Sequence, residues 1–93
     1  MLNQENTRAI LLFMTTNCRF EHPEKQRYYK IVLAQDLFGE WVVTRVWGGI
    51  GKATGRITHY PCGTQADGLK LIEKISKTRL ARGYVACFVE IST

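Results

Sequence analysis

The sequence predicts an α+β fold in which a small antiparallel β-sheet of four or five strands packs with one α-helix. Three observations lead to this fold class. The chain of 93 residues has room for one hydrophobic core, so residues 1–93 should form a single domain. Several short segments have the apolar or alternating pattern of strands, each bounded by turn residues. One longer segment, 64–83, has the period and the capping residues of a helix.

The first third of the chain predicts two strands. Residues 1–7 are polar, and we expect them to be frayed. Residues 9–15 are apolar and short, which predicts a buried strand, and residues 17–27 read as a polar connector. Residues 28–34 return to a strand pattern with Lys30 on one face. The opposite face of that strand carries Tyr29, Ile31 and Leu33.

Two further strands surround a glycine-rich loop. Turn residues at 36–40 precede a strand at 41–47, and residues 56–60 form a fourth short strand that Pro61 should end. Alternation within the 41–47 strand divides its side chains between the two sheet faces. One face carries Val42, Thr44 and Val46, and the other carries Trp41, Val43, Arg45 and Trp47.

The helix and a last strand complete the domain, in the order β-β-β-β-α-β. Thr64 with Asp67 three residues later is close to a capping box, and Gly83 suits a left-handed helix end. An apolar stripe faces the sheet and consists of Leu69, Ile72, Ile75, Ser76 and Leu80. The opposite side carries Lys70, Lys74 and Lys77, which is typical of a solvated helix face. Residues 84–91 read as the last strand.

Composition and charge narrow the class of protein. A hydrophobic fraction of 45% and a charged fraction of 23% are those of an ordinary globular protein. The net charge of +5 is compatible with a polyanionic partner such as nucleic acid. The apolar run at 9–14 is too short for a membrane span or a secretory signal, so we expect a cytoplasmic protein. Three scattered cysteines, an odd count, favour free thiols: Cys18, Cys62 and Cys87.

The glycine-rich segment 43–55 resembles a nucleotide-binding loop only superficially. A P-loop fails because Val46 stands where its first glycine belongs and Ala53 follows Lys52. The dinucleotide fingerprint fails because Thr54 occupies its third glycine position and no helix follows. Neither nucleotide-binding fold is therefore predicted.

The runs "YYKIVLAQD" and "EWVVTRVWGGIG", followed by a strand, a capped helix and "LARGY", resemble the WGR domain family. The similarity spans roughly residues 8–85 and depends on Arg45, Trp47, Gly48 and the pair Ile50-Gly51. This family occurs in DNA-dependent poly(ADP-ribose) polymerases and as small bacterial proteins or fused modules. The resemblance implies a small antiparallel sheet backed by one helix. It also implies DNA-end binding, with the tryptophan packed on a terminal nucleotide and basic groups on the backbone.

The chain departs from the family signature at its third residue, which is Gly49 instead of arginine. In the polymerases, that arginine helps to link the module and the DNA to neighbouring domains. Its loss is consistent with a free-standing role, and it removes one cation from the loop.

These residues predict a non-enzymatic module that binds DNA through its backbone or ends. Trp47 would be a stacking platform, although an indole at a strand end is also a common core residue. The predicted nucleic-acid-binding residues are Arg45, Trp47, Gly48, Gly49, Lys52 and Arg56. A protein-interaction adaptor that uses the same surface is the alternative, because Trp and Arg are hot-spot residues in both settings.

Metal binding and catalysis receive little support from the sequence. Cys18 with His22, and His59 with Cys62, offer the ligand types of a structural zinc site. Their order is unusual and Pro61 interrupts the second pair, so a zinc-stabilised domain or small enzyme is a third hypothesis. Because no carboxylate pair or nucleophile–base pair stands out, we expect no cofactor and no catalytic residues.

Overall fold

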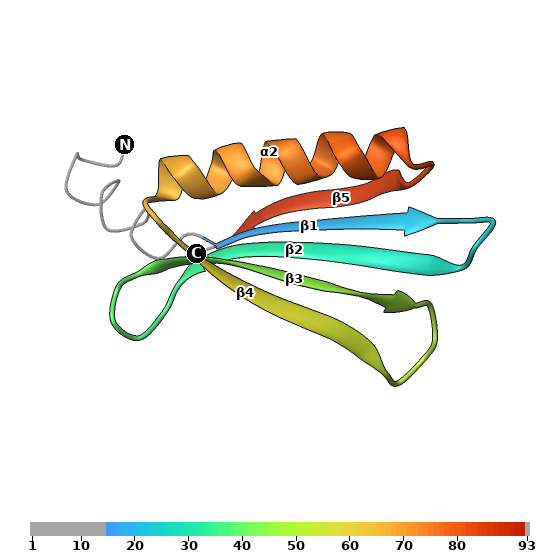
Figure 1. Cartoon of the computed structure of the whole chain (residues 1–93), viewed down its shortest axis with the longest axis horizontal. Coiled ribbons are helices and arrows are strands. Elements are labelled where there is room, and N and C mark those ends of the chain that lie inside the picture. The colour runs from blue at the N-terminus through green and yellow to red at the C-terminus, as the bar shows by residue number, and fades with distance from the viewer. Residues whose placement is uncertain (1–14, 93) are drawn as a thin grey trace.

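The computed structural model describes residues 15–92, which form a five-stranded sheet and one long helix (Figure 1). The strand order is β4-β3-β2-β1-β5, and every neighbouring pair is antiparallel. This architecture confirms the predicted α+β fold. In chain order the elements are β1 (Thr15–His22), β2 (Arg27–Gln35), β3 (Trp41–Gly49), β4 (Gly55–Gly63), α2 (Gln65–Ala81) and β5 (Val85–Ser92).

Helix α2 runs across one face of the sheet and connects the edge strand β4 to the opposite edge strand β5 (Figure 1). The predicted cap is confirmed, since the Thr64 hydroxyl accepts a hydrogen bond from the Asp67 amide at 3.1 Å. The predicted stop is confirmed as well, because Gly83 follows the helix with φ of +92°. Both ends of α2 are therefore set by residues that the sequence analysis identified.

The hydrophobic core lies between α2 and the central strands. Ile31, Leu33 and Val43 are completely buried at its centre. A Cβ atom on Gly68 would overlap Leu33 Cδ1, so the missing side chain lets the helix approach the sheet closely. The other core residues are Cys18, Phe20, Tyr29, Ile72 and Ile75.

The first strand differs from the prediction. Residues 17–22 belong to β1, so the prediction of a polar connector over 17–27 was wrong. This strand alternates buried and half-buried positions, and its half-buried side chains are polar, which disguised it in the sequence. The buried positions are Thr16, Cys18, Phe20 and His22. Residues 9–14 of the expected first strand, and the expected frayed residues 1–7, lie outside the described residues.

Two further predictions needed correction. Strand β4 continues through Pro61 to Gly63, because an edge strand tolerates the missing amide donor of proline. The helix is also rotated from its expected orientation. Ile72 and Ile75 are buried as predicted, but Leu69 and Leu80 are 44% and 52% exposed.

Candidate nucleic-acid interface

Two connecting segments meet at one end of the sheet. Strands β1 and β3 run in the same direction, so the β1–β2 turn and the β3–β4 loop lie at the same end of the molecule (Figure 1). Between them is a cavity of about 610 Å³, here called the loop-end cavity. Trp47 and three glycines line it together with four cations, Lys25, Arg27, Lys52 and Arg56. Among its described lining residues there is no Asp or Glu.

Trp47 lies between the core and this cavity. It is half-buried, and its ring forms an offset stack with Tyr29, with centroids 5.7 Å apart and planes 16° apart. It also packs against the core cluster, and its cross-strand neighbour in β4 is Arg56. One part of the indole is therefore packed in the core, and the rest of its surface lines the cavity. The core interpretation describes the first part, and the platform interpretation describes the second.

Gly48 and Gly49 belong to strand β3 and not to the flexible loop that the sequence suggested. Neither has a positive φ, whereas Gly51 in the loop has φ of +76°. A Cβ atom on Gly48 would lie 3.2 Å from Gly55 Cα, so this position is crowded. A Cβ atom on Gly49 would lie 2.8 Å from Lys52 Cγ, which shows that the lysine side chain folds across the glycine.

Arg45 does not line the loop-end cavity. It lies two residues before Trp47 on the same face of β3 and lines a second cavity of about 300 Å³ between α2 and the sheet. This helix-side cavity also includes Tyr29, Lys74 and Arg79. Five of the six predicted binding residues thus meet at the loop-end cavity: Trp47, Gly48, Gly49, Lys52 and Arg56.

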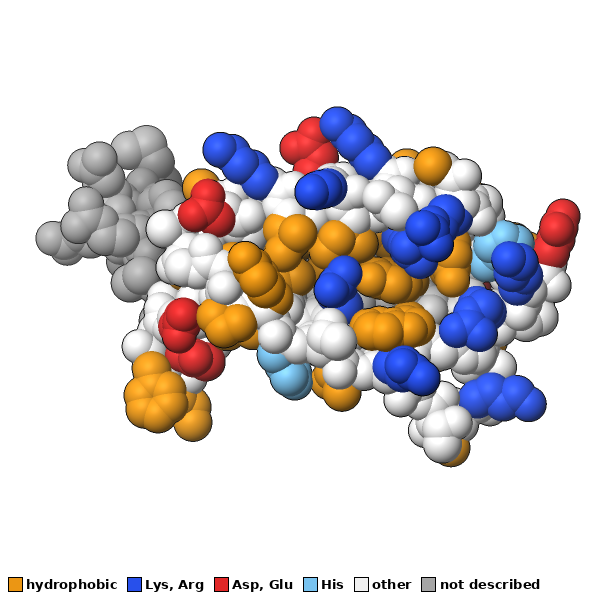
Figure 2. Space-filling view, in the orientation of Figure 1, with side chains coloured by type: hydrophobic (Ala, Val, Ile, Leu, Met, Phe, Trp, Pro, Cys, Tyr) orange, Lys and Arg blue, Asp and Glu red, His pale blue; other side chains and the backbone are white. Residues whose placement is uncertain are grey.

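The predicted site omits four cations that line these two cavities: Lys25, Arg27, Lys74 and Arg79. Lys25 and Arg27 were hidden because the β1–β2 hairpin was not recognised, and Arg27 pairs with Gly49 across the sheet. Lys74 was assigned to a solvated helix face. Figure 2 shows the result, with Lys and Arg side chains gathered around hydrophobic ones in the half that holds the β1–β2 turn and the β3–β4 loop. The sequence does show basic residues near strand ends, which was the available signal for this site. Which of these residues lie together in space depends on the strand register.

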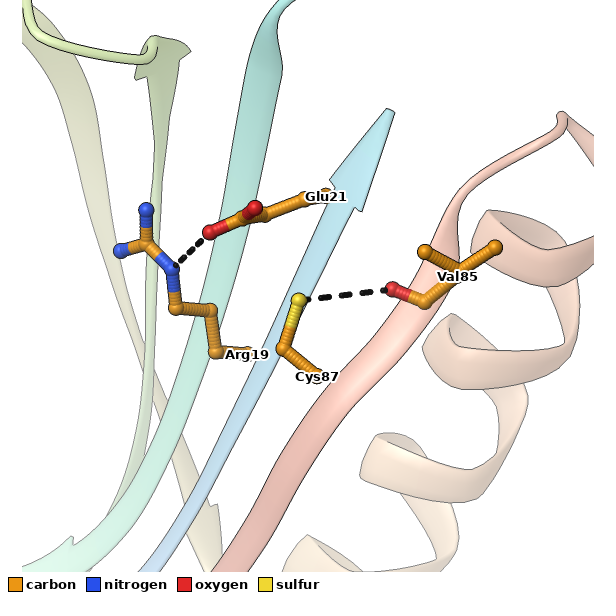
Figure 3. Close-up of polar contacts among 4 residues, drawn as sticks. All are labelled: Arg19, Glu21, Val85 and Cys87. Carbon is orange, nitrogen blue, oxygen red and sulfur yellow. Dashed lines mark hydrogen bonds and ion pairs between the residues drawn. The ribbon is translucent and has the colours of Figure 1, made fainter. Parts of the chain in front are cut away.

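Other polar groups lie apart from this surface. On the opposite face, Arg19 Nε donates to Glu21 Oε2 at 2.9 Å (Figure 3). The Arg19 guanidinium also lies 4.9 Å from the centre of the Tyr28 ring. On the helix, Lys77 and Glu73 form an ion pair at 3.3 Å, one helical turn apart. Cys87 is exposed on β5, with its thiol directed at the Val85 carbonyl (Figure 3).

The hypothetical zinc ligands are separated by the sheet. Cys18 and His22 are buried on the helix-bearing side, whereas His59 bonds Thr44 at 2.9 Å on the other face. Within residues 15–92, no group of three or more His, Cys, Asp or Glu side chains could hold a metal ion.

All three cysteines are free, and burial raises the pKa of the Cys18 thiol. No helix in the described part of the chain is long and apolar enough to cross a membrane.

The fold and this surface define a small α+β binding module with an aromatic and basic face. The family model for the WGR domain matches residues 12–87, most of the chain, and the chain therefore belongs to the WGR domain family. The resemblance noted in the sequence is confirmed. WGR domains are in general nucleic-acid-binding modules and are not catalytic by themselves. Searches of curated proteins and of solved structures gave no match.

Proposed function

We propose that this chain is a non-enzymatic module that binds DNA through its backbone, and through its ends, at the loop-end cavity. The observation that carries the proposal is the position of Trp47, a half-buried indole beside four cations with no carboxylate among the described lining residues. Cations hold phosphates, and an indole offers a flat surface for a sugar or base. The family's general association with nucleic acid supports the same function.

The positions of the lining residues suggest which part of the DNA each of them contacts. Lys25 and Arg27 approach from the β1–β2 turn, and Lys52 and Arg56 approach from the β3–β4 side. Phosphates of one strand would lie between these two pairs, with the terminal sugar or base against Trp47. Backbone contacts of this kind carry no sequence information, so we expect little base preference.

The test is fluorescence-anisotropy binding to blunt duplex, nicked duplex and single strand at several salt concentrations. Four cations predict a duplex slope of log affinity against log salt of roughly three to four. Lys52→Ala with Arg56→Ala should reduce this slope by about two, because each lost phosphate contact reduces it by about one. A control for position is Lys30→Ala, which removes one cation from the opposite face of the sheet.

Two outcomes would count against backbone binding. A nearly flat salt dependence would contradict it, and so would strong discrimination between shuffled sequences. If no nucleic acid binds at low salt, the protein-interaction adaptor becomes the better function for the same surface. Trp47 and the arginines beside it are hot-spot residue types in that setting too.

A further inference from the structure

The helix-side cavity has no role in the function proposed above. Its charged lining residues are all cations: Arg45 from β3, and Lys74 and Arg79 from α2. Among the described residues that line it there is no Asp or Glu. The ion pairs within residues 15–92 join Arg19 to Glu21 and Lys77 to Glu73, so none of these three cations is neutralised by a described carboxylate.

Arg79 is held in place by aromatic rings. Its guanidinium carbon lies 4.5 Å from the centre of the Tyr29 ring and 5.3 Å from the centre of the Tyr84 ring. Its Nε atom is buried and has no hydrogen-bond partner among the described residues. Arg45 has only a long contact, 3.5 Å from Nη1 to the Tyr29 hydroxyl. Two guanidinium groups are thus positioned by one tyrosine, and neither is paired with an acid in the described chain.

The same tyrosine joins the two cavities. Tyr29 lines the helix-side cavity and stacks on Trp47, which lines the loop-end cavity. The aromatic pair therefore separates two groups of cations on one face of the sheet. A strand of nucleic acid has this alternation, since each sugar, with its flat base attached, lies between two charged phosphates.

We propose that the helix-side cavity binds a backbone phosphate of the same strand that the loop-end cavity holds. This inference rests on the proposed function. It gives the bound strand a path over the protein surface, from the β3–β4 loop across Trp47 to α2. Three cations within about 300 Å³ fit one phosphate group. Bound phosphate would also reduce the mutual repulsion of Arg45, Lys74 and Arg79.

Lys74→Ala tests the inference, with Lys70→Ala as its matched control. Both substitutions remove an exposed lysine from α2 and change the net charge equally, but Lys70 lines neither cavity. Binding of the full chain to duplex and to single strand would be measured at several salt concentrations. Lys74→Ala should weaken binding roughly three- to tenfold and reduce the salt slope by about one. Lys70→Ala should leave both quantities nearly unchanged.

Two further variants keep the outcome clear. Arg79→Lys retains the charge but loses the planar stack over Tyr29, and its melting temperature shows whether the fold is kept. In a folded variant we expect weaker binding with a similar salt slope. Equal effects of Lys74→Ala and Lys70→Ala would overturn the inference. If the loop-end variant Lys52→Ala with Arg56→Ala still lost affinity in that case, the proposed function would stand. Absence of binding by the unmodified chain would remove both proposals.

Discussion

Replacing Trp47 with alanine separates the structural part of this residue from its part in binding. Truncating a fully buried aromatic costs about 3–5 kcal/mol of folding free energy. Trp47 is only half-buried, so we expect a loss of about 1.5–2.5 kcal/mol, part of it from the stack with Tyr29. A stacking contact with a base adds about 1–3 kcal/mol to binding, so the Kd should rise about 5- to 150-fold.

The assay pairs urea unfolding with a DNA titration on the same preparation. Trp41→Ala is the control, because Trp41 is also half-buried against the core and shares the sheet face of Trp47. It stands at the other end of β3 and lines neither cavity. The control should lose stability and keep its affinity for DNA. If folded Trp47→Ala binds as tightly as the unmodified chain, the platform hypothesis is wrong and Trp47 is a core residue alone.

Two other variants or treatments test the description of the site. Gly49→Arg should raise DNA affinity by up to about tenfold, since an exposed charge-assisted contact contributes about 1.4 kcal/mol at most. Its melting temperature should change little, because Gly49 has no positive φ and only the flexible Lys52 side chain must move; unchanged affinity in a stable variant would place the DNA elsewhere. In the native protein at pH 8, iodoacetamide should modify the exposed Cys87 first and Cys18 last, as followed by mass spectrometry. Burial raises the pKa of the Cys18 thiol, so less of this thiol is thiolate at a given pH, and its lag behind Cys87 should shorten as pH rises. Equal rates for Cys18 and Cys87 in folded protein would contradict the burial of Cys18 in β1.

The sequence predicted those elements whose signals are local. Alternation located β2 and β3, and the Thr64 hydroxyl and Gly83 located the helix ends. The same alternation placed Arg45 and Trp47 on one face of β3. Strand β1 was missed because its half-buried side chains are polar. Its buried positions include few large apolar residues, so the segment reads as a polar connector in the sequence.

The cavities themselves could not be predicted, because they depend on register and on helix placement. Arg27 lines the same cavity as Trp47 because it pairs with Gly49, and no local pattern specifies that pairing. Lys74 lines the same cavity as Arg45 because of the rotation of α2 that leaves Leu69 and Leu80 exposed. The cations of each cavity come from more than one element, so their separation in the sequence does not predict their distance in space.

The strand order has a consequence for how this domain assembles. Strands β1 to β4 follow one another as hairpins, so three of the four strand pairings join neighbours along the chain. The fourth pairing joins β1 to β5, the first and last described strands, and requires a much longer loop to close. The three hairpin pairings can therefore form before β5 pairs with β1. Until β5 arrives, β1 is an unprotected edge onto which another chain can add a strand.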